Sequence, residues 1–564
     1  MNQLTGAQMV IEALHLEGVK VIFGYPGGAV LHIYDEIYKQ QYFNHILARH
    51  EQGAVHAADG YARSSGEVGV AIITSGPGFT NAITGIATAY TDSIPLVVIS
   101  GQVPITQIGT DAFQEIDAVG ISRPCTKHNF LVRHITELPR ILKEAFYIAK
   151  SGRQGPVLVD IPKDITGTLG EFTYPNSITL QSYKPTIKGN PRQIKKLCEA
   201  LICAKKPLLY IGGGAILSNA GEDVRELAHR TGIPCVETLL ARGVLAHNDE
   251  NLLGMLGMHG SYAANMAVSE CDLLVCLGAR FDDRVTGRLS DFAKGAKIAH
   301  IDIDPSSIGK IVSVDFPIVG DLKHILADMM IELSTYNSEH IAEWKAYLHT
   351  LAKQNPLTYT DSTDSIKPQW VVQKIGEMLG DKAIITTDVG QHQMWAAQFY
   401  PFSFPRQFLT SGGLGTMGYG LPAALGAKLA REDKHIINIT GDGSILMNIQ
   451  ELMTCVEYNI PLVSVILNNN YLGMVRQWQS FFYDNRFSHV DLSMQPDFIK
   501  LIESFGGVGF RVECKETFEN ALKQALAAKK VAFIEVIVDR HEDVLPMVPT
   551  GGALHEMILH KKQK

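Results

Sequence analysis

The chain has 564 residues, of which 46% are hydrophobic and 19% are charged, and its formal net charge at pH 7 is −8. This composition is typical of a folded protein with about three or four domains and excludes a disordered or fibrous chain. The mild negative charge, without a basic stripe interleaved with aromatic residues, argues against a nucleic acid partner.

The sequence shows no sign of a secreted or membrane protein. Its eight cysteines are scattered without CxxC spacing or a histidine cluster beside them, which argues against a zinc site or a disulfide framework. The first residues lack a basic start followed by a long apolar segment, and no apolar run approaches membrane-spanning length. We therefore expect a cytoplasmic protein that does not contact membranes.

Short β-branched runs alternate with helical patterns along nearly the whole chain. This alternation predicts an α/β fold of doubly wound parallel sheets with helices on both faces. Continuous apolar runs of this length suit central strands that are buried on both sides. In chain order, the clearest predicted strands are residues 68–74, 94–100, 155–161, 207–213, 272–278, 383–388, 435–440 and 462–468.

Two segments, residues 71–101 and 437–469, look like copies of one design. Each reads as a strand, a Gly-x-Gly turn, a helix, an Ile-Pro-Leu sequence and a second strand, and the spacing from turn to proline differs by one residue. Two ordinary βαβ units could converge on this pattern, but the shared Ile-Pro-Leu favours two homologous sheets that hold a ligand between them.

Polar and proline-rich stretches at residues 171–193 and 343–369 separate a third α/β block from these two. A stretch rich in proline and glycine follows the last predicted helix, and we expect it to form an arm over a surface or active site. The predicted domains are residues 1–175, 190–340 and 365–545, followed by an arm at residues 546–564.

An acidic turn, Gly441-Asp442-Gly443, ends one of the predicted strands. Ligands of open parallel sheets bind beyond the carboxyl ends of the strands, where glycines allow close approach and a helix N-terminus favours anions. Asp442 could simply cap the helix. The alternative is a Mg²⁺ ligand, because Mg²⁺ takes few protein ligands and shares its octahedron with phosphate. Three asparagines at residues 468–470 end the next strand, where asparagine is disfavoured, and could supply a second ligand.

The order GDGS, helix, strand and NN resembles the metal–diphosphate signature of thiamine diphosphate (ThDP) enzymes. The resemblance implies that Asp442, Asn469 and the backbone carbonyl of Tyr471 bind Mg²⁺. It also implies that Glu51, in RHEQGAVHAADGYAR, is the catalytic glutamate that hydrogen-bonds the pyrimidine ring of the cofactor. Alone, Glu51 would be an ordinary charged helix residue. The other implied ThDP-binding residues are Gly390, Gln391, His392, Gly415, Met417, Gly443 and Ser444.

Longer stretches resemble one family of ThDP enzymes, the catalytic subunits of acetohydroxyacid (acetolactate) synthases. GYPGGAVLHIYDE, GTDAFQE, GARFDDRVTG, GGLGTMGYGLPAALGA and GMVRQWQ occur in order, so the resemblance covers essentially the whole chain. It implies decarboxylation of pyruvate and transfer of the hydroxyethyl group to a second 2-ketoacid. Pyruvate as acceptor would yield 2-acetolactate, and 2-ketobutyrate would yield 2-aceto-2-hydroxybutyrate, in the biosynthesis of valine, leucine and isoleucine.

The same resemblance implies roles for single residues. Met417 would separate the two cofactor rings, although a methionine in a glycine-rich loop is otherwise a flexible gap-filler. Arg284 would bind the carboxylate of the acceptor and, with Trp478, favour the larger ketoacid. Alone, Arg284 would be an ordinary surface ion-pair residue. The remaining implied residues are Gln114 at the catalytic site and Gly28, Phe113 and Lys163 along the substrate channel.

Residues 280–292 resemble the segment that marks FAD-containing, anabolic members of this family. FAD would be structural, because the reaction has no net redox change. The GGG sequence at residues 212–214 would by itself be weak evidence for a dinucleotide. The implied FAD-binding residues are Arg153, Met258, His259, Gly260, Gly278, Ala279, Arg280, Asp302, Asp304 and Asp321.

The family resemblance implies partners as well as cofactors. The catalytic glutamate and the diphosphate site come from different subunits in these enzymes, so we expect a homodimer or a dimer of dimers. A separate regulatory small subunit is also expected.

Other functions are compatible with the fold. They are a redox ThDP–flavin enzyme such as pyruvate oxidase, a carboligase that acts on glyoxylate, and a non-catalytic protein that keeps the fold. Arg284, Trp478 and the RFDDRVTG sequence argue against the first two, and the presence of Glu51, Asp442 and Asn469 argues against the third.

Overall fold

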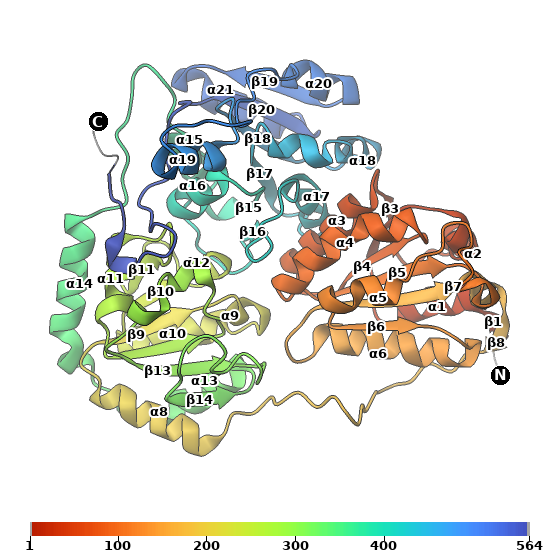
Figure 1. Cartoon of the computed structure of the whole chain (residues 1–564), viewed down its shortest axis with the longest axis horizontal. Helices are drawn as coiled ribbons and strands as arrows, with labels where there is room; N and C mark the ends of the chain where they lie inside the picture. The colour runs from red at the N-terminus through yellow and green to blue at the C-terminus, as the bar shows by residue number, and fades with distance from the viewer. Residues whose placement is uncertain (1–2, 561–564) are drawn as a thin grey trace.

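The computed structural model describes residues 3–560, which form three six-stranded parallel sheets and one small antiparallel pair (Figure 1). Alternate residues of a central strand pack into different apolar clusters. In β4, for example, Val70 and Ile72 belong to one cluster, and Ala71 and Ile73 belong to another. The sheets are therefore buried on both faces, as the continuous apolar runs predict.

The first domain contains a sheet in the order β3-β2-β4-β5-β7-β6. Its strands are β2 (Val21–Gly24), β3 (Asn44–Leu47), β4 (Gly69–Ile73), β5 (Leu96–Gln102), β6 (His128–Leu131) and β7 (Pro156–Pro162). Its helices are α1 (Gly6–Leu16), α2 (Leu31–Lys39), α3 (Glu51–Ser65), α4 (Pro77–Thr91), α5 (Ala118–Ser122), α6 (Leu138–Lys150) and α7 (Lys163–Gly167). Beside them, β1 (Gln3–Thr5) pairs antiparallel with β8 (Leu169–Glu171).

The central domain has the strand order β11-β10-β9-β12-β13-β14. Its strands are β9 (Pro207–Ile211), β10 (Cys235–Glu237), β11 (Leu252–Met255), β12 (Leu273–Leu277), β13 (Lys297–Asp302) and β14 (Phe316–Val319). Its helices are α8 (Pro191–Cys203), α9 (Gly214–Leu217), α10 (Gly221–Thr231), α11 (Tyr262–Glu270), α12 (Asp283–Thr286), α13 (Leu322–Glu332) and α14 (Ala342–Gln354).

The third domain has the strand order β16-β15-β17-β18-β20-β19. Its strands are β15 (Ala383–Thr387), β16 (Phe408–Thr410), β17 (His435–Gly441), β18 (Val463–Asn468), β19 (Val508–Val512) and β20 (Ala532–Ile537). Its helices are α15 (Pro368–Leu379), α16 (Gln391–Phe399), α17 (Gly420–Ala430), α18 (Glu451–Glu457), α19 (Gly473–Phe482), α20 (Phe498–Phe505) and α21 (Lys515–Ala527).

The strand orders show which domains are alike. When the strands of each sheet are numbered in chain order, the first and third sheets both read 2-1-3-4-6-5, whereas the central sheet reads 3-2-1-4-5-6. The latter is the order of dinucleotide-binding doubly wound folds. The predicted likeness of the first and third domains and the Rossmann-like character of the central domain are confirmed.

The two similar segments differ after the glycine turn. In the first domain, α4 starts directly at Pro77, whose ring holds φ near the helical value. In the third domain, which has no proline there, a 3-10 turn (Ser444–Asn448) follows Gly443, and α18 starts only at Glu451. The helix expected directly after the acidic turn therefore begins as a 3-10 turn.

The first and third domains pack together through α3 and α17 (Figure 1). A Cβ atom on Gly426 would lie 1.8 Å from the carbonyl oxygen of Ala57, and one on Gly60 would lie 2.2 Å from that of Ala423. Only glycine allows this approach of the two backbones. The contact makes one apolar cluster out of residues from both domains.

The C-terminal arm lies on the central domain. Met547 and Ile558 form an antiparallel bridge, the backbone N–H of Val548 donates to the Met258 carbonyl at 2.7 Å, and Arg288 pairs with Glu556. The last four residues of the predicted arm, 561–564, lie outside the described residues.

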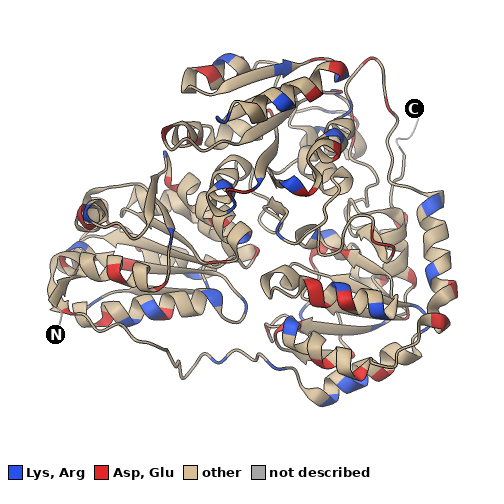
Figure 2. Cartoon of the chain, turned by 180° about the vertical axis from the view of Figure 1, so that it is seen from behind, with Lys and Arg blue, Asp and Glu red and all other residues tan. Residues whose placement is uncertain are grey.

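Charged residues of both signs are mixed along the part of the chain that the structure describes. In the view of Figure 2, basic and acidic residues are interspersed over all three domains. Within residues 3–560, none of the helices is both long and apolar enough to cross a membrane.

Candidate active site

The carboxyl ends of β17 and β18 bring Asp442 and the three asparagines together. Asp442 is 2% exposed, and its carboxylate accepts hydrogen bonds from the Gln495 side chain and from the backbone N–H of Asn470. The Asn469 side chain accepts from the Tyr471 N–H at 3.0 Å and donates to Gln391 at 3.2 Å. The residues predicted to bind Mg²⁺ therefore lie around one turn.

The surroundings of Asp442 suit a cation. Burial raises the pKa of Asp442 to about 7, because its hydrogen-bond partners are neutral and do not offset the loss of water. Among the residues that the structure describes, no three His, Cys, Asp or Glu side chains are grouped as a metal site. One carboxylate, an amide oxygen and a backbone carbonyl form the kind of oxygen set that Mg²⁺ uses when phosphate supplies further ligands. The residues fit Mg²⁺ together with a diphosphate.

His392 marks the place for that diphosphate. It lies in the first turn of α16, against Gly441, where an added Cβ would be 3.0 Å from the His392 Nδ1. His392 is 6% exposed, and burial lowers its pKa to about 3. Its Nε2 has no hydrogen-bond partner within residues 3–560. A buried nitrogen without a partner beside a helix N-terminus is suited to a phosphate oxygen when it carries the ring proton and can donate.

A cavity of about 1320 Å³ is lined by residues of all three domains. Arg284 and Trp478 meet on its wall, where the guanidinium carbon of Arg284 lies 6.0 Å from the indole centroid. The cavity is larger than the roughly 300–1000 Å³ of a typical single-ligand site. The predicted site residues that line it are Gly390, Gly415 and Met417 for ThDP, Arg284 and Trp478 for substrate, and Arg153, Met258, His259, Gly278, Ala279, Arg280, Asp302 and Asp321 for FAD.

Two predicted FAD residues are not on the cavity wall. Asp304 lies behind Arg153, with which it forms an ion pair at 3.2 Å. Gly260 lies against the backbone of Leu256, because an added Cβ would be 2.6 Å from the Leu256 carbonyl carbon.

The ThDP and substrate residues predicted in the first domain follow the carboxyl ends of β2, β3, β5 and β7 and, unlike Arg153, do not line this cavity. Glu51 begins α3, is 8% exposed and accepts a hydrogen bond from Asn81 at 3.0 Å. Phe113 is 88% exposed. Within one chain, Glu51 and Met417 therefore do not share a cavity. The other residues at this edge are Gly28, Gln114 and Lys163.

Comparison with known proteins places the whole chain in one family. Models of the N-terminal, central and C-terminal domains of thiamine pyrophosphate enzymes match residues 4–121, 194–329 and 388–536. The acetolactate synthase large subunit of Haemophilus influenzae is 49% identical over 570 residues, which cover 100% of both chains. The isozyme 3 large subunit of Escherichia coli K12 is 48% identical, also over 100% of both. The chain belongs to the acetolactate synthase family.

A third relative supports the same assignment. The probable acetolactate synthase large subunit of Methanocaldococcus jannaschii is 47% identical over 98% of this chain and 95% of its own length. The predicted family, fold class and enzyme class are thus confirmed. The two outer domains are both thiamine pyrophosphate binding domains by description, in agreement with the ThDP prediction. The three matched segments lie inside the three predicted domains.

Some residues of the candidate site were not predicted. Met474 lines the cavity four residues before Trp478 on α19, and helical spacing alone places both on one face. Gln495, which donates to Asp442, comes from a loop that returns to the turn from outside the sheet. No periodic pattern marks Gln495, so only the tertiary structure reveals it.

Proposed function

We propose that the chain is the catalytic subunit of an acetolactate synthase that uses ThDP and Mg²⁺ to join two 2-ketoacids. Membership of the acetolactate synthase family carries the proposal, and the meeting of Met417, Arg284 and Trp478 on one cavity supports it. When bound, ThDP supplies the carbon nucleophile and electron sink that decarboxylation of a 2-ketoacid requires.

The third domain would hold the phosphate end of the cofactor. Asp442, Asn469 and the Tyr471 carbonyl would bind Mg²⁺, since they supply only oxygen ligands around one turn. His392 would place its unpartnered Nε2 against a phosphate oxygen. The residues proposed to complete the diphosphate site are Gly390, Gln391, Gly443 and Ser444.

Glu51 would act on the pyrimidine end of a cofactor held by a second copy of the chain. Its buried carboxylate lies at a sheet edge away from the cavity that Met417 lines. The exposed Phe113 at the same edge also suits an interface with another copy. In such a homodimer, Glu51 would hold and transfer a proton at the pyrimidine ring while Gln114, Gly28, Phe113 and Lys163 line the path of the substrate.

Arg284 and Trp478 would select the acceptor. The Arg284 side chain is 58% exposed and its Nε lies 3.9 Å from the Asp283 carboxylate, so its outer nitrogens could bind a substrate carboxylate through two hydrogen bonds. The indole beside it offers an apolar wall for the extra methyl group of 2-ketobutyrate. This pairing favours 2-ketobutyrate over pyruvate as the second substrate.

The central domain would bind FAD as a structural group. The dinucleotide-binding strand order and the cavity wall around Gly278 and Arg280 support this assignment. The relatives are named large subunits. We therefore include a separate small subunit as a proposed partner of this chain.

The test is the reaction of the purified chain with pyruvate in the presence of ThDP, Mg²⁺ and FAD. We expect acetolactate and carbon dioxide, and with both ketoacids present an excess of 2-aceto-2-hydroxybutyrate. Hydrogen peroxide formation without acetolactate would instead identify a flavin oxidase and overturn the proposal.

A further inference from the structure

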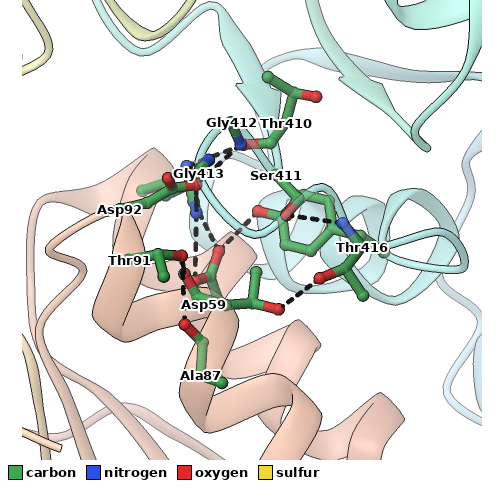
Figure 3. Close-up of polar contacts among 12 residues, drawn as sticks. Asp59, Ala87, Thr91, Asp92, Thr410, Ser411, Gly412, Gly413 and Thr416 are labelled. Atoms are coloured by element: carbon green, nitrogen blue, oxygen red, sulfur yellow. Dashed lines mark hydrogen bonds and ion pairs between the residues drawn. The ribbon is translucent and has the colours of Figure 1, made fainter. Parts of the chain in front are cut away.

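A buried ion cluster lies where the first domain meets the third (Figure 3). Asp59 and Arg63 are on α3, and Asp92 follows the end of α4. The Arg63 side chain donates to Asp59 at 2.6 Å and to Asp92 at 2.8 Å. Their exposed fractions are 0% for Asp59, 5% for Asp92 and 8% for Arg63. Two carboxylates share one guanidinium away from water, so the cluster needs further donors.

Residues 411–417, the cofactor loop, supply those donors to Asp92. The backbone N–H of Gly412 donates to Asp92 Oδ2 at 3.0 Å, and that of Gly413 donates to Asp92 Oδ1 at 2.7 Å. Arg63 in turn donates to the carbonyl of Thr410, just before the loop, at 3.0 Å. Figure 3 shows Asp92 facing the backbone of Gly412 and Gly413. Both oxygens of one buried carboxylate therefore bind adjacent peptide units of the loop.

Two further contacts of the first domain fix the far end of the loop. The hydroxyl groups of Thr88, on α4, and Thr416 are hydrogen-bonded at 2.8 Å, and both residues are buried. The hydroxyl of Tyr419, just after the loop, donates to Asp59 at 2.6 Å. Met417 lies between these two contacts in the chain.

The central domain closes the third side of the loop. A Cβ atom on Gly413 would lie 2.9 Å from Asp92 Oδ1 and 3.1 Å from the Arg280 guanidinium. A Cβ atom on Gly412 would lie 2.9 Å from the side chain of Leu240. The loop therefore runs through a narrow space where all three domains meet, and a larger residue at either position would have to displace these side chains.

The loop cannot hold this shape by its own composition. Three of its seven residues are glycine, which leaves the unrestrained backbone with many accessible conformations. Hydrogen bonds to an ionised acceptor in a buried site are stronger than bonds between neutral groups. Asp92 thus supplies the constraint that the loop lacks.

We propose that Asp92 is a positioning residue of the reaction: it holds the backbone of the cofactor loop so that Met417 faces the cofactor, and Thr88 is a second, uncharged support. The inference rests on the proposed function, because Met417 is assigned to the cofactor there. It assigns a role in the reaction to two residues of the first domain that lie outside the metal, diphosphate and substrate sets.

Two variants test the proposal. Asp92→Asn keeps the side-chain shape but replaces one acceptor oxygen with an N–H₂ donor, which faces a backbone N–H of the loop. Thr88→Val removes only the hydroxyl and leaves the ion cluster intact, so it remains informative if Asp92→Asn does not fold. The matched control is Thr126→Val, because Thr126 is also a buried first-domain threonine but donates to the Ser122 carbonyl, at 2.8 Å.

The full-length chain is assayed for the KM of ThDP, the KM of pyruvate and kcat. Hydrogen exchange of the peptide covering residues 408–420 is followed by mass spectrometry with and without ThDP and Mg²⁺. In Asp92→Asn we expect kcat to fall and the KM of ThDP to rise by about 10- to 100-fold. Thr88→Val should also lower kcat and raise the KM of ThDP, each by a smaller factor. The backbone amides of Gly412 and Gly413 should exchange hydrogen faster in Asp92→Asn.

A purely structural role predicts a different pattern. Loss of folded protein would lower the activity per milligram but leave the KM of ThDP unchanged. Unchanged ThDP KM and unchanged loop exchange in the variants, or equal effects in Thr126→Val, would overturn the proposal. The exchange measurement needs no catalysis, so it shows whether Asp92 holds the loop even in a chain without activity. Absence of acetolactate formation by the wild-type chain would refute only the proposed function.

Discussion

Both carboxylate oxygens of Glu451 accept a hydrogen bond from the backbone N–H of Arg49, at 3.1 and 3.2 Å. Glu451 begins α18 in the third domain, whereas Arg49 lies in the first domain, two residues before Glu51. One contact therefore ties the helix that follows the acidic turn to the start of the helix that begins with Glu51. Glu451 is 1% exposed, so water does not compete for this contact.

The burial of Glu451 makes the stability of the fold depend on pH, and its hydrogen bond to Arg49 opposes the shift only in part. Burial raises the pKa of Glu451 from its ordinary value to about 7. Because the folded pKa lies above the unfolded one, the stabilisation is complete below about pH 4 and is lost as the pH rises through 7. We expect Glu451→Gln to reduce the difference in unfolding free energy between pH 5 and pH 8 by roughly 3 kcal/mol or less. Urea unfolding of both proteins at the two pH values measures it, and an unchanged difference would contradict the assignment.

Two inactive variants should restore each other if each site is shared between two copies. Glu51→Gln and Asp442→Asn should each cut kcat by about 100-fold or more. A mixed dimer of the two variants contains one site with both native residues. Unfolding and refolding an equal mixture should therefore recover about a quarter of wild-type activity. Glu12→Gln on α1 of the first domain serves as the folding control, and no recovery in the mixture would place Glu51 and Asp442 in the same chain's site.

Binding of Mg²⁺ and ThDP should raise the unfolding temperature through Asp442. A ligand at about 100 times its Kd stabilises a protein by about 2.7 kcal/mol. We expect Asp442→Asn to abolish most of this shift, because the proposed ion loses its charged protein ligand. Asp433→Asn changes an exposed aspartate of the same domain, which pairs with Arg431, and should keep the shift. An equal shift in both variants would contradict the metal assignment.

The acceptor preference should depend on Trp478. Trp478→Leu removes the ring beside Arg284 and with it most of the apolar wall for the extra methyl group. Since one methylene is worth about 10-fold or more in discrimination, the ratio of 2-aceto-2-hydroxybutyrate to acetolactate should fall by about 10-fold. Competition between the two ketoacids measures this ratio. Phe481→Leu, a neighbouring change on α19, should leave it unaltered.

Local patterns predicted the fold class and drew attention to the candidate residues at the strand ends. A buried parallel strand must be continuously apolar, and a turn that admits a phosphate must be glycine-rich, so runs such as residues 435–440 and the turn at Gly441 predict their own structure. The same is true of the repeated order of strand, turn and helix, which anticipated two sheets with one topology. Asp442 and Asn469 were found because each directly follows such a strand.

Contacts between distant segments carried no such signal. Asp92 and Gly413 are 321 residues apart, and Gln495 reaches Asp442 from an irregular loop. Only the family resemblance, and no periodic pattern, indicated that Glu51 does not line the cavity on which Met417 lies in the same chain. Periodicity reports only the burial of a residue relative to its own helix or strand. The hydrogen-bond partners of a buried carboxylate depend on how whole domains pack. Those partners became known only from the folded chain.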